Sequence, residues 1–80
     1  MADIKFTLKF FERLLDERNE LQRKIKSLNF FIKVTPRYNE LNDFQKSALV
    51  EQLEIMEKYL DVLNARIENI EEEYNINNND

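Results

Sequence analysis

Hydrophobic residues recur along the second half of the chain in alternating steps of four and three. From Leu49 to Tyr74 each such step carries an apolar or aromatic side chain: Leu49, Leu53, Met56, Leu60, Leu63, Ile67, Ile70 and Tyr74. An unbroken heptad repeat of this kind predicts a long helix whose apolar stripe packs against a partner helix. We expect this helix over residues 42–74, with Asn42 as N-cap and Gln45 as its capping-box partner.

The same spacing occurs in the first half of the chain and predicts a helix over residues 8–33. Its stripe is Phe11, Leu14, Arg18, Leu21, Ile25, Leu28 and Ile32. Thr7 is the expected N-cap, with Phe6 and Phe11 as a hydrophobic staple. Arg18 stands where leucine is expected. It is either a register device, pairing with an acid of the other helix or reaching solvent, or a buried cation for an anionic ligand.

The chain ends are predicted to lie outside the helices. Residues 1–7 form an expected N-terminal arm, in which the alternation of Ile4, Phe6 and Leu8 allows a short strand. The polar, asparagine-rich residues 75–80 are expected to be a disordered tail. The chain thus divides into an arm, a helical region over residues 8–74 and a tail.

A single proline marks the connection between the two helices. Pro36 disfavours helical backbone at Thr35 and suits the first position of a new helical turn, so residues 35–41 are predicted to be a tight connector. Two long helices with a short connector fold back antiparallel. The fold class is therefore all-α, a coiled-coil-like two-helix hairpin in which Glu17 lies near residues 59–66.

One side of this hairpin combines aromatic rings with charges. Antiparallel pairing brings heptad position g of one helix against position g of the other. These positions hold Phe10, Glu17, Lys24 and Phe31 in the first helix and Gln52, Tyr59 and Arg66 in the second; we call this surface the aromatic flank. The opposite surface, the plain flank, holds Leu15, Gln22, Asn29, Val50, Glu57 and Asn64.

The aromatic flank supplies the candidate ligand-binding residues, because such side chains stack on a planar base and hold phosphate charge. We expect cations to meet the negative charge of a ligand and aromatic rings to stack on it, in a pocket at a subunit junction. Arg13 lies one helical turn from Phe10 and Glu17, within reach of the flank. The candidates are Phe10, Arg13, Glu17, Lys24, Tyr59 and Arg66.

A second interpretation makes the same flank an interface between copies of the chain, with Glu17 and Arg66 as an ordinary ion pair. Many apolar side chains lie off the two heptad stripes: Phe10, Leu15, Phe30, Phe31, Phe44, Val50, Ile55, Tyr59 and Val62. Leaving several aromatic rings in water forgoes several kcal/mol, about 25 cal/mol per Å². We therefore expect a homo-oligomer, with a dimeric four-helix bundle as the simplest closed form.

Composition narrows the chemistry. The 80 residues include no cysteine, histidine or glycine, which removes thiolate metal ligands, the usual neutral-pH base and glycine-rich phosphate loops. We expect no enzymatic activity, no catalytic residues, no metal site and no cofactor. No apolar run is long enough to cross a bilayer and no signal peptide is visible, so we expect a soluble intracellular protein that does not contact membranes.

Charge is spread unevenly along the chain. Residues 1–38 carry nine basic and five acidic side chains, a net charge of +4, whereas residues 39–80 carry three and eleven, a net charge of −8. The simpler explanation is a basic helix that pairs with an acidic one, and the other is that the basic half faces an anionic ligand. The overall charge of −4 disfavours binding to nucleic acid.

Several short motifs resemble a family of small accessory proteins encoded by tailed phages, crAss-like phages among them. The resemblance covers about residues 10–67. It rests on Phe10-Phe11-Glu12-Arg13-Leu14, Glu17-Arg18-Asn19-Glu20-Leu21, Lys26-Ser27-Leu28-Asn29-Phe30-Phe31-Ile32, Gln52, Met56, Tyr59, Leu63 and Arg66-Ile67. This chain has Phe10, Phe11 and Arg18 where the family pattern has tyrosine, glutamine and lysine.

The architecture is also similar to that of another group of phage helical hairpins, the oligomeric sponges that sequester nucleotide immune signals. This chain lacks their glycine-tyrosine-arginine opening, so the similarity is one of architecture. The resemblance implies a phage-encoded, non-catalytic binding protein of the host cytoplasm that counters host defence by sequestering a nucleotide-derived signal. The alternative is a structural or adaptor protein that binds another protein through an apolar helical flank.

Overall fold

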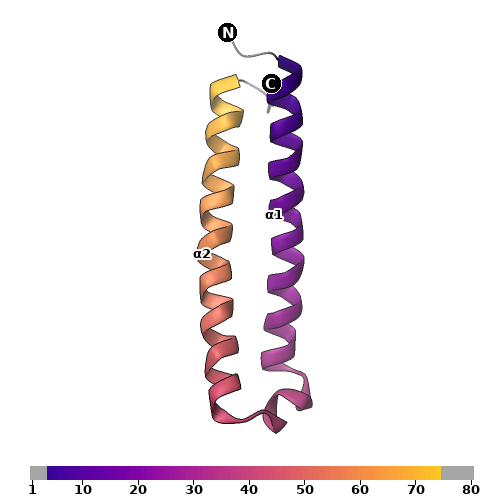
Figure 1. The fold of residues 1–80 in the computed structure, drawn as a ribbon, viewed down its shortest axis with the longest axis vertical. Helices are drawn as coiled ribbons and strands as arrows, with labels where there is room; N and C mark the ends of the chain where they lie inside the picture. Colours follow the sequence, from indigo (N-terminus) through magenta and orange to yellow (C-terminus); the bar gives the residue numbers. More distant parts are fainter. Residues whose placement is uncertain (1–3, 75–80) are drawn as a thin grey trace.

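The computed structural model describes residues 4–74 and shows a hairpin of two long helices. Helix α1 spans Ile4–Lys33, a short 3-10 helix η1 spans Pro36–Glu40, and helix α2 spans Asp43–Tyr74. Figure 1 shows α1 and α2 side by side and joined at one end through η1. The predicted all-α, antiparallel two-helix hairpin is confirmed. The predicted tail, residues 75–80, lies outside the described residues.

The N-terminal boundary differs from the prediction. Helix α1 begins at Ile4, so Thr7 lies inside the helix and is not its N-cap, and residues 4–7 form no strand-like arm. Ile4 lies seven residues before Phe11, which continues the heptad stripe by one repeat. Residues 4–7 are therefore helical, as the heptad spacing favours, and not extended, as the short alternating pattern allowed.

The start of α2 agrees with the predicted N-cap. The Asn42 side-chain oxygen accepts a hydrogen bond from the Gln45 backbone N–H at 2.8 Å. This bond satisfies one of the backbone donors that the first turn of a helix leaves without an intrahelical partner. Thr35 precedes η1 in an extended conformation, with Pro36 in the first turn as predicted.

The connector is held by one aromatic side chain. The Tyr38 ring meets Phe31 edge-on, with centroids 6.1 Å apart, and the Lys46 ammonium lies 6.0 Å from the Tyr38 centroid. The Tyr38 hydroxyl also donates a hydrogen bond to the Lys46 backbone oxygen at 3.3 Å. Tyr38 thus ties the ends of both helices together and fixes the level at which α2 starts relative to α1.

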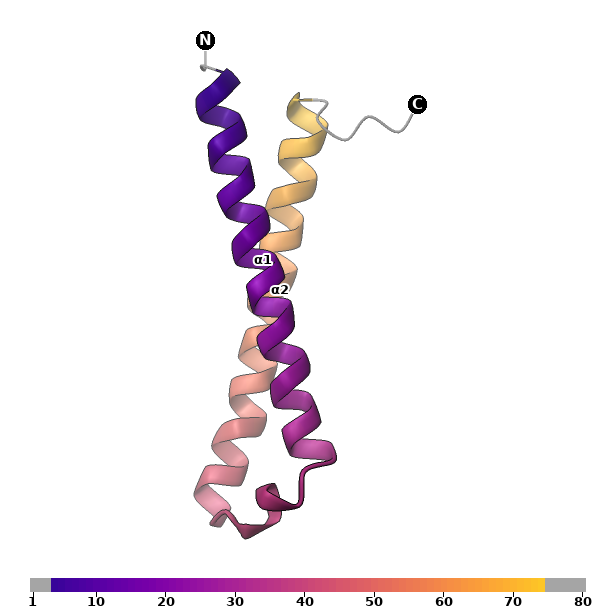
Figure 2. The same cartoon turned by 90° about the vertical axis from the view of Figure 1, so that its right-hand side faces the viewer.

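The buried core is small and lies away from the connector. Its members are Phe11, Leu14, Leu21, Leu63 and Ile67, of which Leu63 is fully buried. The stripe residues nearer the connector, including Ile25, Leu28, Leu49 and Leu53, are only half-buried. Figure 2 shows that the two helices cross near their middle.

Arg18 interrupts the core with a polar contact. Its guanidinium donates to the side-chain oxygen of Asn64 on α2 at 3.0 Å and to that of Asn19 at 2.8 Å. Arg18 is half-buried. The register interpretation is therefore closer to the structure than the buried cation, but the partner is an amide of the plain flank and not an acid.

The hairpin leaves much apolar surface in water. Phe30, Phe44, Ile55, Tyr59 and Val62 are all exposed, Phe44 by 72%. The radius of gyration is 17.2 Å, against about 12 Å for a compact domain of this length. One hairpin is thus a single layer of helices without a second layer to cover its faces.

Candidate functional site

The centre of the aromatic flank is a hydrogen bond between the two helices. The Tyr59 hydroxyl on α2 donates to a carboxylate oxygen of Glu17 on α1. Both side chains are exposed, Tyr59 by 44%. The bond confirms the predicted level of Glu17 beside residues 59–66, and it holds the tyrosine ring against α1.

A second contact lies two helical turns further from the connector. The Arg66 guanidinium carbon sits 5.9 Å from the centroid of the Phe10 ring. A cation placed over an aromatic face in this way is attracted by the ring's negative potential. Phe10 and Arg66 line a shallow groove together with Ala65, Asn69 and Ile70.

The expected ion pair between Glu17 and Arg66 is not formed. Glu17 accepts from Tyr59, and Arg66 lies over Phe10. The ion pair recorded among the described residues joins Glu20 to Arg23 within α1, at 3.8 Å. Among the residues that the structure describes, no carboxylate pairs with Arg66, which leaves its guanidinium donors available to an anion.

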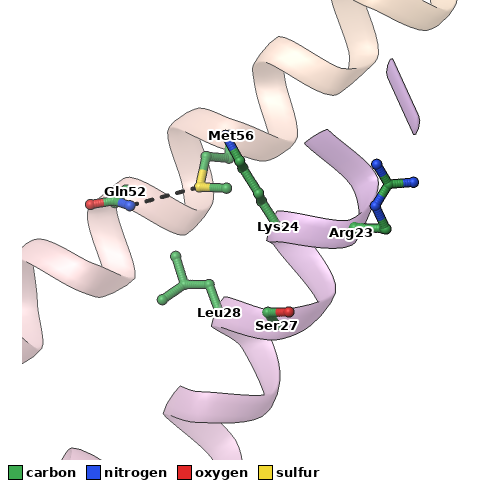
Figure 3. A pocket seen from close by; sticks show the side chains of 6 residues that line it. All are labelled: Arg23, Lys24, Ser27, Leu28, Gln52 and Met56. Carbon is green, nitrogen blue, oxygen red and sulfur yellow. Dashed lines mark hydrogen bonds between the residues drawn. The ribbon is translucent and has the colours of Figure 1, made fainter. Parts of the chain in front are cut away.

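Lys24 faces a third part of the flank, nearer the connector. It lines an open groove of about 420 Å³ with Arg23, Ser27, Leu28, Gln52 and Met56. Figure 3 shows Lys24 extending toward α2 beside Met56, whereas Arg23 points away from α2. The Gln52 side-chain amide donates weakly to the Met56 sulfur at 4.0 Å.

Between these two grooves lies a smaller hollow that contains the central hydrogen bond. Asp16, Glu17, Glu20, Leu21, Lys24 and Tyr59 line it. Five of the six predicted site residues, all except Arg13, thus line the three hollows on one side of the hairpin. Arg13 is exposed, one turn from Phe10 on α1.

The structure adds three residues to the candidate set. Gln52 was placed on the aromatic flank by its heptad position, but its role beside Lys24 was not predicted. Met56 belongs to the α2 stripe, but it is only half-buried and also lines the groove. Arg23 occupies heptad position f, for which the sequence pattern offered no signal.

All three hollows are open to solvent, so one hairpin does not enclose a small molecule on its own. Within residues 4–74 no cluster of three or more acidic side chains is arranged to hold a metal ion. No helix among these residues is long and apolar enough to cross a membrane. The side chains on the flank offer cations, an amide, a carboxylate and two aromatic rings.

Fold and flank together define a small helical hairpin with an open binding surface. Residues 8–69, more than three quarters of the chain, match the Sequestin family. The chain belongs to the Sequestin family, whose name describes a sequestering role, that is, binding. The search of curated proteins and that of solved structures each found no match.

Proposed function

We propose that this protein sequesters a nucleotide-derived immune signal and so protects a phage from host defence. It binds the signal in the host cytoplasm without converting it, and the working form is a homo-oligomer. The observation that carries the proposal is the match to the Sequestin family over residues 8–69, which include every residue of the aromatic flank.

The chemistry of the aromatic flank supports a ligand that combines negative charge with a planar ring. Lys24 and Arg66 are cations whose side chains line grooves, and Phe10 and Tyr59 present aromatic rings on the same side. A nucleotide has both features, a phosphate and a base. Glu17 and Gln52 add an acceptor and an amide that suit the polar edges of a base.

A binding assay with defined nucleotides tests the proposal. The purified protein is screened by thermal shift against cyclic mono-, di- and trinucleotides and ADP-ribose derivatives. A ligand at 100 times its Kd stabilises a protein by about 2.7 kcal/mol. The bound ligand is then released by denaturation and analysed by chromatography. A sponge returns it unchanged, whereas an enzyme returns a product.

Two variants of the same type separate specific binding from general charge attraction. Arg66→Ala removes a cation of the aromatic flank, and Lys58→Ala removes an exposed cation at position f of the same helix. We expect a loss of affinity with the first variant only. Equal losses in both, or no binding of any nucleotide, contradict the proposal.

A second function is favoured by the exposed apolar residues on α2. Ile55 and Val62 are exposed by 59% and 56%, and apolar side chains in that arrangement suit an adaptor that binds another protein. An adaptor gives no thermal shift with small molecules. It retains a specific partner from infected cells, and the Ile55→Lys variant loses that partner.

A further inference from the structure

Helix α2 carries a second stripe besides the one that faces α1. Its members follow the same alternating steps of four and three: Ala48, Gln52, Ile55, Tyr59, Val62, Arg66 and Asn69. It lies about a quarter of a turn around the helix from the first stripe. We call it the outer stripe. Ile55, Tyr59 and Val62 at its centre are exposed by 59%, 44% and 56%.

Acidic residues are excluded from the central part of the outer stripe. Helix α2 contains nine acidic residues, Asp43, Glu51, Glu54, Glu57, Asp61, Glu68, Glu71, Glu72 and Glu73. None of them lies on the outer stripe between Gln52 and Asn69. A solvent-facing surface has no need of such exclusion, whereas a surface that packs against another helix does.

The aromatic flank is also symmetric about its own centre. On α2, Gln52 and Arg66 each lie seven residues from Tyr59, and Ile55 and Val62 lie four before and three after it. A twofold axis at this level therefore pairs Ile55 of one copy with Val62 of the other. It also pairs the Gln52 amide with the guanidinium of Arg66 in the other copy. An isologous dimer requires this kind of self-complementary surface.

Helix α1 has the matching symmetry about Glu17. Phe10 and Lys24 each lie seven residues from Glu17, and Arg13 and Glu20 lie four before and three after it. The same rotation therefore brings the Phe10 ring of one copy to Lys24 of the other. It also brings the Arg13 guanidinium to the Glu20 carboxylate of the other copy. Because the Tyr59 hydroxyl is bonded to Glu17, the two centres of symmetry are at one level of the hairpin.

We infer that a second copy of this chain packs on the aromatic flank about a twofold axis that runs across the flank from Glu17 on α1 to Tyr59 on α2. The axis lies in the plane of the interface and perpendicular to the helices, so α2 of each copy runs antiparallel to α2 of the other. Ile55 then packs against Val62 of the second copy. Arg13 meets Glu20 of the second copy, and Phe10 meets its Lys24.

This dimer joins the two outer grooves into composite sites, a consequence that rests on the proposed function. The rotation brings the groove of Lys24 and Gln52 in one copy over the groove of Phe10 and Arg66 in the other. Each composite site has Lys24 from one chain and Arg66 with the Phe10 ring from the other. The dimer has two such sites, each more enclosed than a groove of the single hairpin.

Disulfide cross-linking tests the axis without any ligand, because the chain has no cysteine of its own. Ile55→Cys alone should not cross-link, since two copies of residue 55 lie about 10 Å apart along the helices. Val62→Cys alone should not either, for the same reason. Mixing the two variants under mild oxidation should give a covalent dimer that links residue 55 to residue 62.

The matched control replaces Ile55→Cys with Val50→Cys, an exposed position of the same helix on the plain flank. That mixture should stay uncrosslinked. Equal cross-linking of one single variant with itself, no cross-linked dimer in the mixture, or a monomeric mass of the wild type by light scattering overturns the axis. An arrangement that packs α2 against α1 of the second copy, which the opposite net charges of the helices favour, also gives no link between residues 55 and 62.

Mixing binding variants tests the composite site. Lys24→Ala and Arg66→Ala should each lose nucleotide binding alone. After the two are mixed and allowed to exchange subunits, about a quarter of the sites regain both cations, because each mixed dimer has one intact site. No recovery in a mixture that cross-linking shows to be dimeric places the site within one chain and overturns this part. Failure of every nucleotide to bind the wild type, with cross-linking intact, refutes the proposed function and leaves the axis standing.

Discussion

Tyr59 and Glu17, 42 residues apart in the chain, are joined by a hydrogen bond across the two helices. This bond sets the relative level of α1 and α2 on the aromatic flank. It also holds the tyrosine ring at the centre of the outer stripe. The first prediction separates the roles of this hydroxyl and this ring.

Tyr59→Phe should retain ligand binding, whereas Tyr59→Ala should weaken it. A base stacked on an aromatic ring is worth about 1–3 kcal/mol by alanine substitution, and phenylalanine keeps the stacking surface. Calorimetric titration of both variants with the same nucleotide measures the difference. Equal losses in the two variants would mean that the hydroxyl, or Glu17 through it, contacts the ligand.

Arg66→Ala should reduce nucleotide affinity by an order of magnitude or more, because a charged hydrogen bond contributes about 1.5–3 kcal/mol. Since Arg66 lies over Phe10 and not against Glu17, its loss leaves Glu17 with its Tyr59 partner. The unfolding temperature should therefore change little. Affinity and oligomer mass are measured on one sample, and an intact affinity would leave Arg66 as a solvated surface charge.

Leu63→Ala should be among the most destabilising single truncations of the hairpin. Leu63 is fully buried, and a buried leucine cut to alanine costs about 2–5 kcal/mol. Urea unfolding at fixed protein concentration measures the change in the free energy of unfolding. Val50→Ala is the control, because Val50 is 40% exposed and its truncation should cost far less.

Arg18→Leu should stabilise the hairpin. Arg18 occupies a stripe position but binds the Asn64 and Asn19 amides, and leucine there would extend the apolar seam between Leu14 and Leu21. We expect a higher unfolding temperature together with a broader range of oligomer sizes, because a polar layer fixes register. A lower unfolding temperature would show that the Arg18 bonds outweigh the gain from burial.

Asn42→Ala should destabilise α2 by about 0.5–2 kcal/mol, because the Asn42 side chain caps the Gln45 N–H. Asn42→Asp should retain most of the stability, since a carboxylate caps as well as an amide does. Thermal unfolding followed by circular dichroism compares the two variants. Equal losses would assign the effect to packing around the connector.

The sequence predicted the two helices and their pairing level because both depend on local rules. The heptad steps define the stripes, and Pro36 with Asn42 confines the connector to a few residues. Once the connector is short, antiparallel geometry places Glu17 beside Tyr59 without further information. The start of α1 was placed late because Ile4, Phe6 and Leu8 fit both a strand pattern and one more helical repeat.

The contacts on the aromatic flank were less predictable. Several position-g side chains of one helix lie within reach of each long side chain on the other, and heptad letters do not choose among them. In the structure Arg66 lies over the Phe10 ring, and Glu17 accepts a hydrogen bond from the Tyr59 hydroxyl. The groove between Lys24 and Met56 depends on how the two helices cross, which heptad spacing does not give.

The position of the buried core far from the connector has a kinetic consequence. Contacts near the connector, such as Tyr38 with Lys46, close short loops, whereas Phe11 and Ile67 must close a loop of more than fifty residues. Short loops close at lower entropic cost. We therefore expect the helices to pair first beside η1 and the buried core layers to form last. Truncations at Phe11 or Ile67 should then speed unfolding and leave the folding rate nearly unchanged, whereas Tyr38→Ala should slow folding in stopped-flow measurements.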